Sequence, residues 1–296
     1  MNSKQLILFF KGLSMGLADL IPGVSGGTIA LILGIYKEFI SSLKSINFQS
    51  INLLFRLNFK KLSQQINLKF LLPIFFGIVC AIFSFSNLIF FLLSDYRVLI
   101  FSFFFSLILF SSIKLIFNEK PYELYKITMV IIGIGIGYFI SLIDPISVSN
   151  NYISIYLSAC IAISAMLLPG ISGSYILLIL GKYEYILESV KVLRFDIILT
   201  FILGAITGII LFSKIINWLL SEYYSSTILF LSGLMLGALN KVWPWVYKDL
   251  NYFPKTYTSL SGDENYFIIS ILIFSVIGIL PYSLKFTWAP FLDRFS

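Results

Sequence analysis

The chain carries one short sequence twice, and this repeat constrains its fold more than any other feature. Residues 19–28 read Asp-Leu-Ile-Pro-Gly-Val-Ser-Gly-Gly-Thr, and residues 166–175 read Met-Leu-Leu-Pro-Gly-Ile-Ser-Gly-Ser-Tyr. Aligning residues 18–40 with residues 165–187 gives 12 identical positions out of 23. Because proline, glycine and serine carry the match, a shared apolar composition does not explain it. The repeat indicates a protein of two related halves.

The composition indicates that the chain lies in a membrane. Hydrophobic residues make up 58% of its 296 residues and charged residues only 12%, about half the charged fraction of a soluble domain. Six apolar runs approach the roughly 20 residues that a membrane-crossing helix needs. They are residues 70–93, 98–117, 127–143, 196–220, 227–243 and 266–284. We therefore predict an all-α polytopic membrane protein.

A second alignment divides the chain into its halves. Residues 76–96 match residues 203–223 at nine positions, at a different offset from the motif. Residues 1–150 are predicted to hold a motif segment at 5–40, a basic cytoplasmic linker at 41–69 and three transmembrane helices within 70–143. Residues 151–296 are predicted to hold a motif segment at 152–187 and three transmembrane helices within 196–284.

The motif segments allow two topologies. After Gly27, the apolar stretch 28–36 gives about 14 Å of helix, about half of the hydrocarbon core. This length favours a re-entrant hairpin, which leaves three crossings per half and so produces two inverted repeats. Alternatively, residues 6–36 and 152–183 are broken helices that cross the membrane fully. Both topologies put the basic linker in the cytoplasm.

The Pro-Gly-x-Ser-Gly motif predicts an anion site. It interrupts a helix, because proline lacks an N–H donor and glycine disfavours helix. Two such breaks at matching positions indicate a shared binding site near the membrane midplane, where helix N-termini and hydroxyl groups suit phosphate or carboxylate. The predicted binding residues are Pro22, Gly23, Ser25, Gly26, Gly27, Thr28, Pro169, Gly170, Ser172, Gly173 and Ser174. Close helix packing through small residues is the competing interpretation.

Several polar side chains near the motif are ambiguous. Asp19 marks a pathway or a coupling ion, or it caps the broken helix; its repeat mate is Met166, which makes the halves asymmetric. Lys11, two helical turns earlier, shares this coupling role or extends to the interface. Tyr36 and Lys182 are expected to anchor their helices at the membrane surface, with gating of the site as the alternative.

The remaining features exclude several functions. The chain has no histidine, no nucleotide-binding motif and no metal-ligand spacing around its two cysteines, so we predict no cofactor, no metal and no catalytic residue. The net charge of +7 is attributed to the cytoplasmic linker and anionic lipid rather than to nucleic acid. Lys241, which aligns with Lys114, is expected at a solvated helix end.

These motifs resemble those of a known family. The run from Lys11 through Asp19 to Thr28, paired with residues 165–174, closely resembles the bacterial membrane family catalogued as DUF368, regarded as polyprenyl-phosphate transporters. The resemblance implies a non-enzymatic flippase of the bacterial cytoplasmic membrane that returns undecaprenyl phosphate, the lipid carrier of cell-wall assembly, to the cytoplasmic leaflet. It also implies inverted repeats with re-entrant segments. Polyprenyl-phosphate and membrane lipids are the implied partners, a proton or sodium ion is the candidate coupling ion, and the sequence does not indicate the oligomeric state.

Two other functions fit part of the same pattern. The second motif is similar to the Pro-Gly-x-Ser-Arg-Ser sequence of membrane undecaprenyl-diphosphate phosphatases, but Gly26 and Gly173 stand where that enzyme has an arginine. Without that charge, phosphoryl transfer is disfavoured. A secondary transporter of a small soluble anion fits the motif equally well; whether the cavity opens to lipid distinguishes it.

Overall fold

The computed structural model describes residues 3–46, 50, 56, 61, 63, 65–121, 123–146 and 148–283, with side chains described to residue 278. About half of the predicted cytoplasmic linker at 41–69 lies outside the described residues. The helices are α1 Ser3–Asp19, α2 Gly26–Ile32, α3 Tyr36–Lys44, α6 Leu68–Asp95, α7 Arg97–Asn118, α8 Leu124–Leu142, α9 Tyr152–Met166, α10 Gly173–Ile179, α11 Tyr183–Lys191, α12 Phe195–Glu222, α13 Tyr224–Ala238, η1 Leu239–Val242, α14 Pro254–Ser261 and α15 Phe267–Ser283. Strands β1 Val246–Tyr247 and β2 Leu250–Asn251 form a small antiparallel hairpin.

Long apolar helices confirm a multi-pass membrane protein. Five helical segments among the described residues are long and apolar enough to span a membrane: α6, α7, α8, α12 and the continuous segment Tyr224–Val242. They match five of the six predicted runs. The sixth run forms α15, whose 17 residues give about 26 Å of helix. Large side chains point outward from these helices, as in Phe83 (84% exposed) and Phe139 (68%), which suits contact with lipid.

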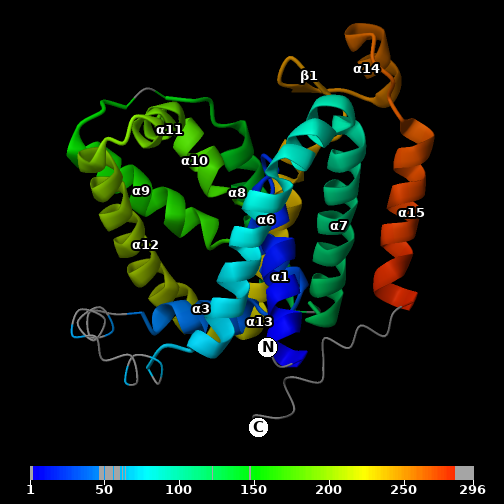
Figure 1. Ribbon diagram of the computed structural model, residues 1–296. Coiled ribbons are helices and arrows are strands. Elements are labelled where there is room, and N and C mark those ends of the chain that lie inside the picture. The colour runs from blue at the N-terminus through cyan, green and yellow to red at the C-terminus, as the bar shows by residue number, and fades with distance from the viewer. Residues whose placement is uncertain are drawn as a thin grey trace.

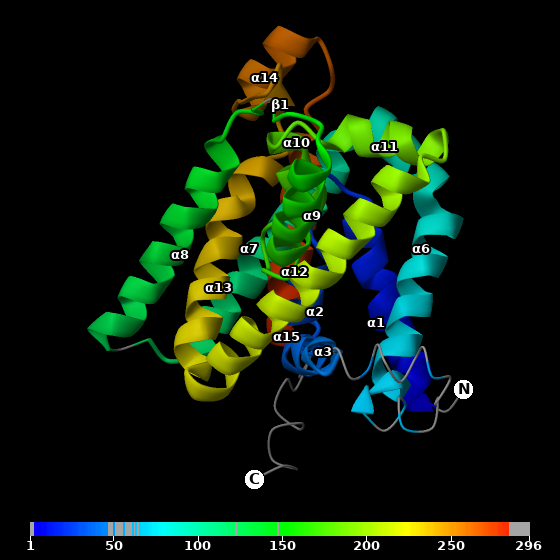
Figure 2. The ribbon, with the colours of Figure 1, turned by 90° about the vertical axis from the view of Figure 1, so that its left-hand side faces the viewer.

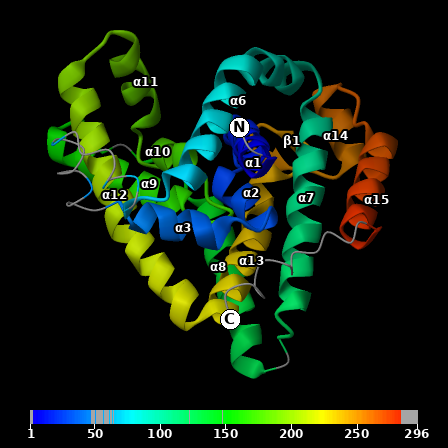
Figure 3. The same cartoon turned by 60° about the horizontal axis from the view of Figure 1, so that its bottom comes forward.

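The molecule has two distinct ends. The α3 end carries the N-terminal start of α1 together with α3, and the α14 end carries β1, α11 and α14 (Figure 1). The segment from α1 to α3 begins and ends at the α3 end, while α11, which follows α9 and α10, lies at the α14 end (Figure 2). With the α3 end turned forward, α3 lies across α12 (Figure 3).

Glycines allow three helix pairs to pack closely. The pairs are α8 with α13, α1 with α6, and α9 with α12. A Cβ atom added to Gly133 of α8 would overlap the Phe230 carbonyl oxygen of α13, and one added to Gly77 of α6 would overlap the Phe9 carbonyl oxygen of α1. These backbones approach through small residues, which is how membrane helices commonly associate.

The short helix α2 lies entirely in the core. All seven of its residues are buried, whereas its repeat counterpart α10 buries only Gly173 and Ile179. The two motif helices therefore differ in environment despite their similar sequences. Because of this difference, α10 has exposed residues, such as Ser174, and α2 has none.

Candidate functional site

The two motif copies contact each other directly. Thr28 Oγ1 accepts a hydrogen bond from the Gly170 N–H at 2.8 Å, and Ser25 Oγ donates to the Met166 carbonyl at 3.4 Å. The Tyr36 hydroxyl donates to the Leu167 carbonyl at 2.8 Å. The structure therefore joins residues about 140 positions apart in the sequence, and it brings the two predicted site segments together.

In the first copy, the N–H groups at the start of α2 are already bonded. The Gly26 N–H donates to Asp19 Oδ1 at 2.6 Å, the Gly27 N–H to Ser25 Oγ at 3.2 Å, and the Thr28 N–H to the Ser25 carbonyl at 2.9 Å. Asp19 is thus the anion at this helix end, in the capping geometry that the sequence left as an alternative. The positive end of the α2 dipole is compensated within the protein.

Lys11 occupies the opposite end of α2. Its ammonium donates to the carbonyl of Leu33, the residue that ends the helix, at 2.9 Å. Asp19 and Lys11, both on α1, therefore hold the two ends of one buried helix with the charge signs that its dipole favours. The ammonium of Lys11 is therefore bonded within the fold.

The second copy lacks this arrangement. Met166 replaces Asp19, and α10 begins at Gly173 without a side-chain cap. Ser172 Oγ and Ser174 Oγ instead bond each other at 2.8 Å. The start of α10 therefore has polar groups that no carboxylate compensates.

Both motif turns depend on glycine and pack against the end of α13. Gly23 has φ +85° and Gly170 has φ +93°, a left-handed region that other residues rarely adopt. A Cβ on Gly170 would lie 3.0 Å from the Met235 Cα atom, and a Cβ on Gly23 would lie 3.3 Å from Val242 Cγ1. These close approaches fix both turns against α13 and η1.

The exposure of the predicted site residues follows the same asymmetry. Pro22 and Ser174 are exposed, and Lys11, Asp19, Gly23 and Gly170 are partly exposed; Ser25, Gly26, Gly27, Thr28, Pro169, Ser172 and Gly173 are buried.

Two interfacial anchors expected from the sequence are wrong. Tyr36 is 2% exposed and Lys182 is fully buried. The Lys182 ammonium donates to the carbonyls of Val148 and Ser149 and to Asn150 Oδ1 at 2.5–2.7 Å. Both side chains form hydrogen bonds to segments that are distant in the sequence. Their position at a helix end did not indicate these partners.

A narrow cavity of about 10 Å³ lies between the motif turns and the ends of α8 and α13, with room for about one water molecule. It is lined by Gly23, Gly137, Ile140, Ser141, Gly170, Ile171, Ser172, Tyr175, Ala238 and Lys241. The ammonium of Lys241 stands 4.7 Å from the centre of the Tyr175 ring. The sequence placed Lys241 at a solvated helix end; it is exposed but also lines this cavity. In the sequence, Lys241 was distinguished only by its alignment with Lys114 in the repeat.

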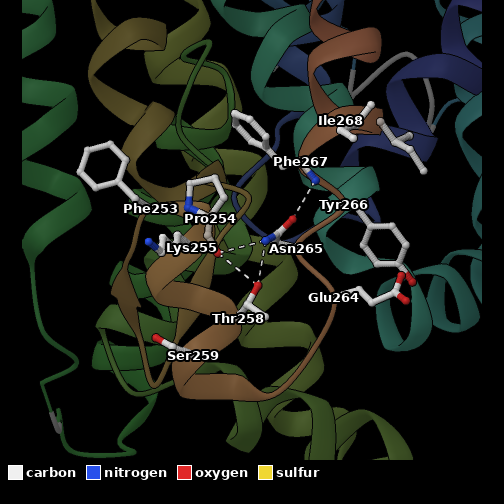
Figure 4. A pocket seen from close by; sticks show the side chains of 11 residues that line it. Phe253, Pro254, Lys255, Thr258, Ser259, Glu264, Asn265, Tyr266, Phe267 and Ile268 are labelled. Carbon is white, nitrogen blue, oxygen red and sulfur yellow. Dashed lines mark hydrogen bonds between the residues drawn. The ribbon is translucent and has the colours of Figure 1, made fainter.

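A larger groove at the α14 end contains no motif residue. It has a volume of about 1170 Å³ and lies between α14 and the start of α15 (Figure 4). The side chain of Asn265 connects α14 to the start of α15. Its amide donates to Thr258 Oγ1 at 2.8 Å, and its carbonyl oxygen accepts from the Phe267 N–H at 3.0 Å. Its lining is mostly apolar, with Lys255 and Glu264 as the charged members.

Comparison with known proteins gives consistent matches. The family described as undecaprenyl phosphate translocase-like matches residues 15–258. A polyprenyl-phosphate transporter of Vibrio cholerae is 42% identical over 237 residues, covering 80% of this chain and 77% of that protein. A polyprenyl-phosphate transporter of Staphylococcus aureus is 35% identical over 269 residues, covering 82% of this chain and 88% of that protein. No solved structure matches the chain.

Proposed function

The chain belongs to the undecaprenyl phosphate translocase-like family, and we propose that it carries undecaprenyl phosphate across the bacterial cytoplasmic membrane to the cytoplasmic leaflet. Two relatives with substantial identity are named polyprenyl-phosphate transporters, which supports transport of a polyprenyl phosphate and a non-enzymatic role. The physical requirement is to hold a phosphate headgroup away from bulk water while the isoprenoid chain stays in lipid.

The contact between the two motif copies carries this proposal. In a membrane protein, irregular backbone at membrane depth is tolerated only inside protein or beside a water-filled cavity. Here the Thr28–Gly170 and Ser25–Met166 hydrogen bonds join two breaks in the chain, and the cavity borders both turns. Paired breaks of this kind form substrate sites in many transporters.

We assign different roles to the two copies. Pro22, Gly23, Ser25, Gly26, Gly27 and Thr28 shape the site, because the N–H groups of 26–28 are bonded within the protein. Pro169, Gly170, Ser172, Gly173 and Ser174 are assigned to the headgroup side of the site, because Gly170 and Ser172 line the cavity and α10 starts without a side-chain cap. Asp19 is the candidate for proton or sodium coupling; Lys11 supports it by holding the other end of α2.

We propose that the halves, 1–150 and 151–296, are inverted repeats with re-entrant motif segments. The segment from α1 to α3 starts and ends at the α3 end, and α11 returns to the α14 end (Figure 2). These positions favour hairpins over full crossings. Cytoplasmic loops are rich in lysine and arginine, so we assign the α3 end, with the basic linker that follows α3, to the cytoplasm. The α14 end then lies outside.

The test is leaflet exchange of undecaprenyl phosphate in liposomes that contain the purified protein. We expect exchange by the wild type, its loss in Ser25→Ala/Ser172→Ala, and no release of inorganic phosphate. Ser232→Ala is the matched control: Ser232 is also fully buried, but its hydroxyl bonds only the Ile228 carbonyl of its own helix. This control variant should keep full exchange.

Other outcomes point to the alternatives. Absence of exchange under imposed proton and sodium gradients, together with uptake of a small anion, would indicate a soluble-anion transporter. Release of phosphate from undecaprenyl diphosphate would indicate a phosphatase.

A further inference from the structure

We propose that Lys241 is the cation that receives the phosphate monoester as it enters from the α14 end. This inference rests on the proposed function and adds a binding residue outside both motifs. A phosphate monoester carries up to two negative charges, and a lysine ammonium is a suitable point-charge partner for it.

Lys241 lies where such a group would meet the motif. It lines the same cavity as Ser172 of the second motif and Gly23 of the first. Tyr175, whose ring lies below the ammonium at 4.7 Å, comes three residues after Ser172 and belongs to α10. One cation and both motif turns therefore border the same cavity. Because this cavity holds only about one water molecule, the phosphate would meet the exposed Lys241 at its edge.

Among the described residues, Lys241 takes part in neither of the two ion pairs Lys126–Glu123 and Arg194–Asp196. Its ammonium lies over the face of the Tyr175 ring, a weak attraction at an exposed site. A phosphate would bind the ammonium far more strongly than the ring does, so the position suits an anionic ligand.

The backbone fixes Lys241 relative to the motifs. A Cβ atom on Gly23 would lie 3.4 Å from the Lys241 Cβ and carbonyl oxygen atoms. A Cβ atom on Gly170 would lie 3.0 Å from the Met235 Cα atom of α13, the helix that leads into η1 and Lys241. The start of the lysine side chain is therefore held at the turns, while its four-carbon stem lets the ammonium move with the ligand.

The position also implies a side of entry. Lys241 lies in η1, five residues before β1, and β1 and α14 mark the α14 end (Figure 1). A headgroup arriving from the leaflet at that end reaches Lys241 before the α3 end. With the topology proposed above, this is the outer leaflet.

The experiment measures equilibrium binding to purified full-length protein with three probes: undecaprenyl phosphate, undecaprenol and inorganic phosphate. For Lys241→Gln we expect about a tenfold or larger loss of affinity for undecaprenyl phosphate, the scale for loss of one charge-assisted contact, and unchanged affinity for undecaprenol. Lys241→Arg should recover most of the affinity. Lys248→Gln is the matched control, because Lys248 also stands over a tyrosine ring, Tyr247 at 5.4 Å, but does not line this cavity.

Each other outcome contradicts a specific statement. Wild-type affinity of Lys241→Gln for undecaprenyl phosphate, or an equal loss for undecaprenol, would overturn the role of Lys241. A wild type that exchanges no lipid, but binds inorganic phosphate in a Lys241-dependent manner, would overturn the proposed lipid substrate and keep Lys241 as a phosphate ligand.

Discussion

At the scale of single residues, the charges on α1 matter because they bracket α2. Asp19 accepts from the Gly26 N–H, and Lys11 donates to the Leu33 carbonyl. A carboxylate at the N-terminal end and an ammonium at the C-terminal end both oppose the helix dipole. Asp19 and Lys11, the candidates for coupling, therefore also stabilise the buried helix α2. A variant that tests coupling must keep this stabilising contact.

Asp19→Asn separates charge from capping. The asparagine carbonyl can still accept from the Gly26 N–H, so the fold should persist while the charge is lost. If Asp19 couples transport, undecaprenyl phosphate exchange by this variant should no longer respond to an imposed proton or sodium gradient. The measurement is exchange with and without each gradient, and a response equal to that of the wild type would exclude coupling through Asp19.

Asp19→Ala should behave differently from Asp19→Asn. It leaves the buried Gly26 N–H without its acceptor, which costs about 1–3 kcal/mol. Thermal unfolding in detergent should therefore show a clear decrease in Tm for the alanine variant and a smaller decrease for the asparagine variant. Equal decreases would mean that the hydrogen bond to Gly26 contributes little.

At the scale of elements, the packing of α8 on α13 depends on where glycine lies. Gly133 and Gly137 face backbone atoms of α13, whereas a Cβ on Gly135 would have no neighbour within 4 Å. The three glycines lie two residues apart in one helix, but only Gly133 and Gly137 face the partner helix. The side of the helix, rather than the residue type, decides the function of each.

This contrast gives a matched pair of variants. Gly133→Ala forces a methyl group against the Phe230 carbonyl and should lower stability by about 1–3 kcal/mol. Gly135→Ala meets no neighbour and should leave stability unchanged or raise it, because alanine favours helix. Thermal unfolding of both variants in detergent tests the pair, and equal effects would contradict the observed α8–α13 interface.

At the scale of the whole molecule, the proposed inverted topology predicts which surface positions share a side of the membrane. In a background without Cys80 and Cys160, single cysteines at exposed Ser3 and Ser41 should react with a membrane-impermeant reagent only from the cytoplasmic side. Cysteines at exposed Asp144 and Glu188 should react only from outside. Full crossing by the motif segments would instead put the members of each pair on opposite sides.

The sequence by itself determined that this chain is a membrane protein with helices in all six predicted runs, five of them long enough to span a membrane, because apolar length is a local property. It also determined that the helices break at both Pro-Gly motifs, since the backbone restrictions of proline and glycine act locally. Local pattern offered capping by Asp19 as one of two roles, and the structure shows that Asp19 and Ser25 accept from N–H groups at the start of α2. The asymmetry expected from Asp19 and Met166 extends to the environment of the two motif helices, because α2 is fully buried and α10 is not.

Only the tertiary structure decided which distant groups stand beside the motifs. Thr28 meets Gly170, Tyr36 and Lys182 are buried, and Lys241 reaches the cavity because helices far apart in the chain pack through small residues. Such contacts depend on helix rotation and close approach, which hydrophobic length does not specify. The asymmetry of the site thus arises from packing around two related segments, together with the replacement of Asp19 by Met166.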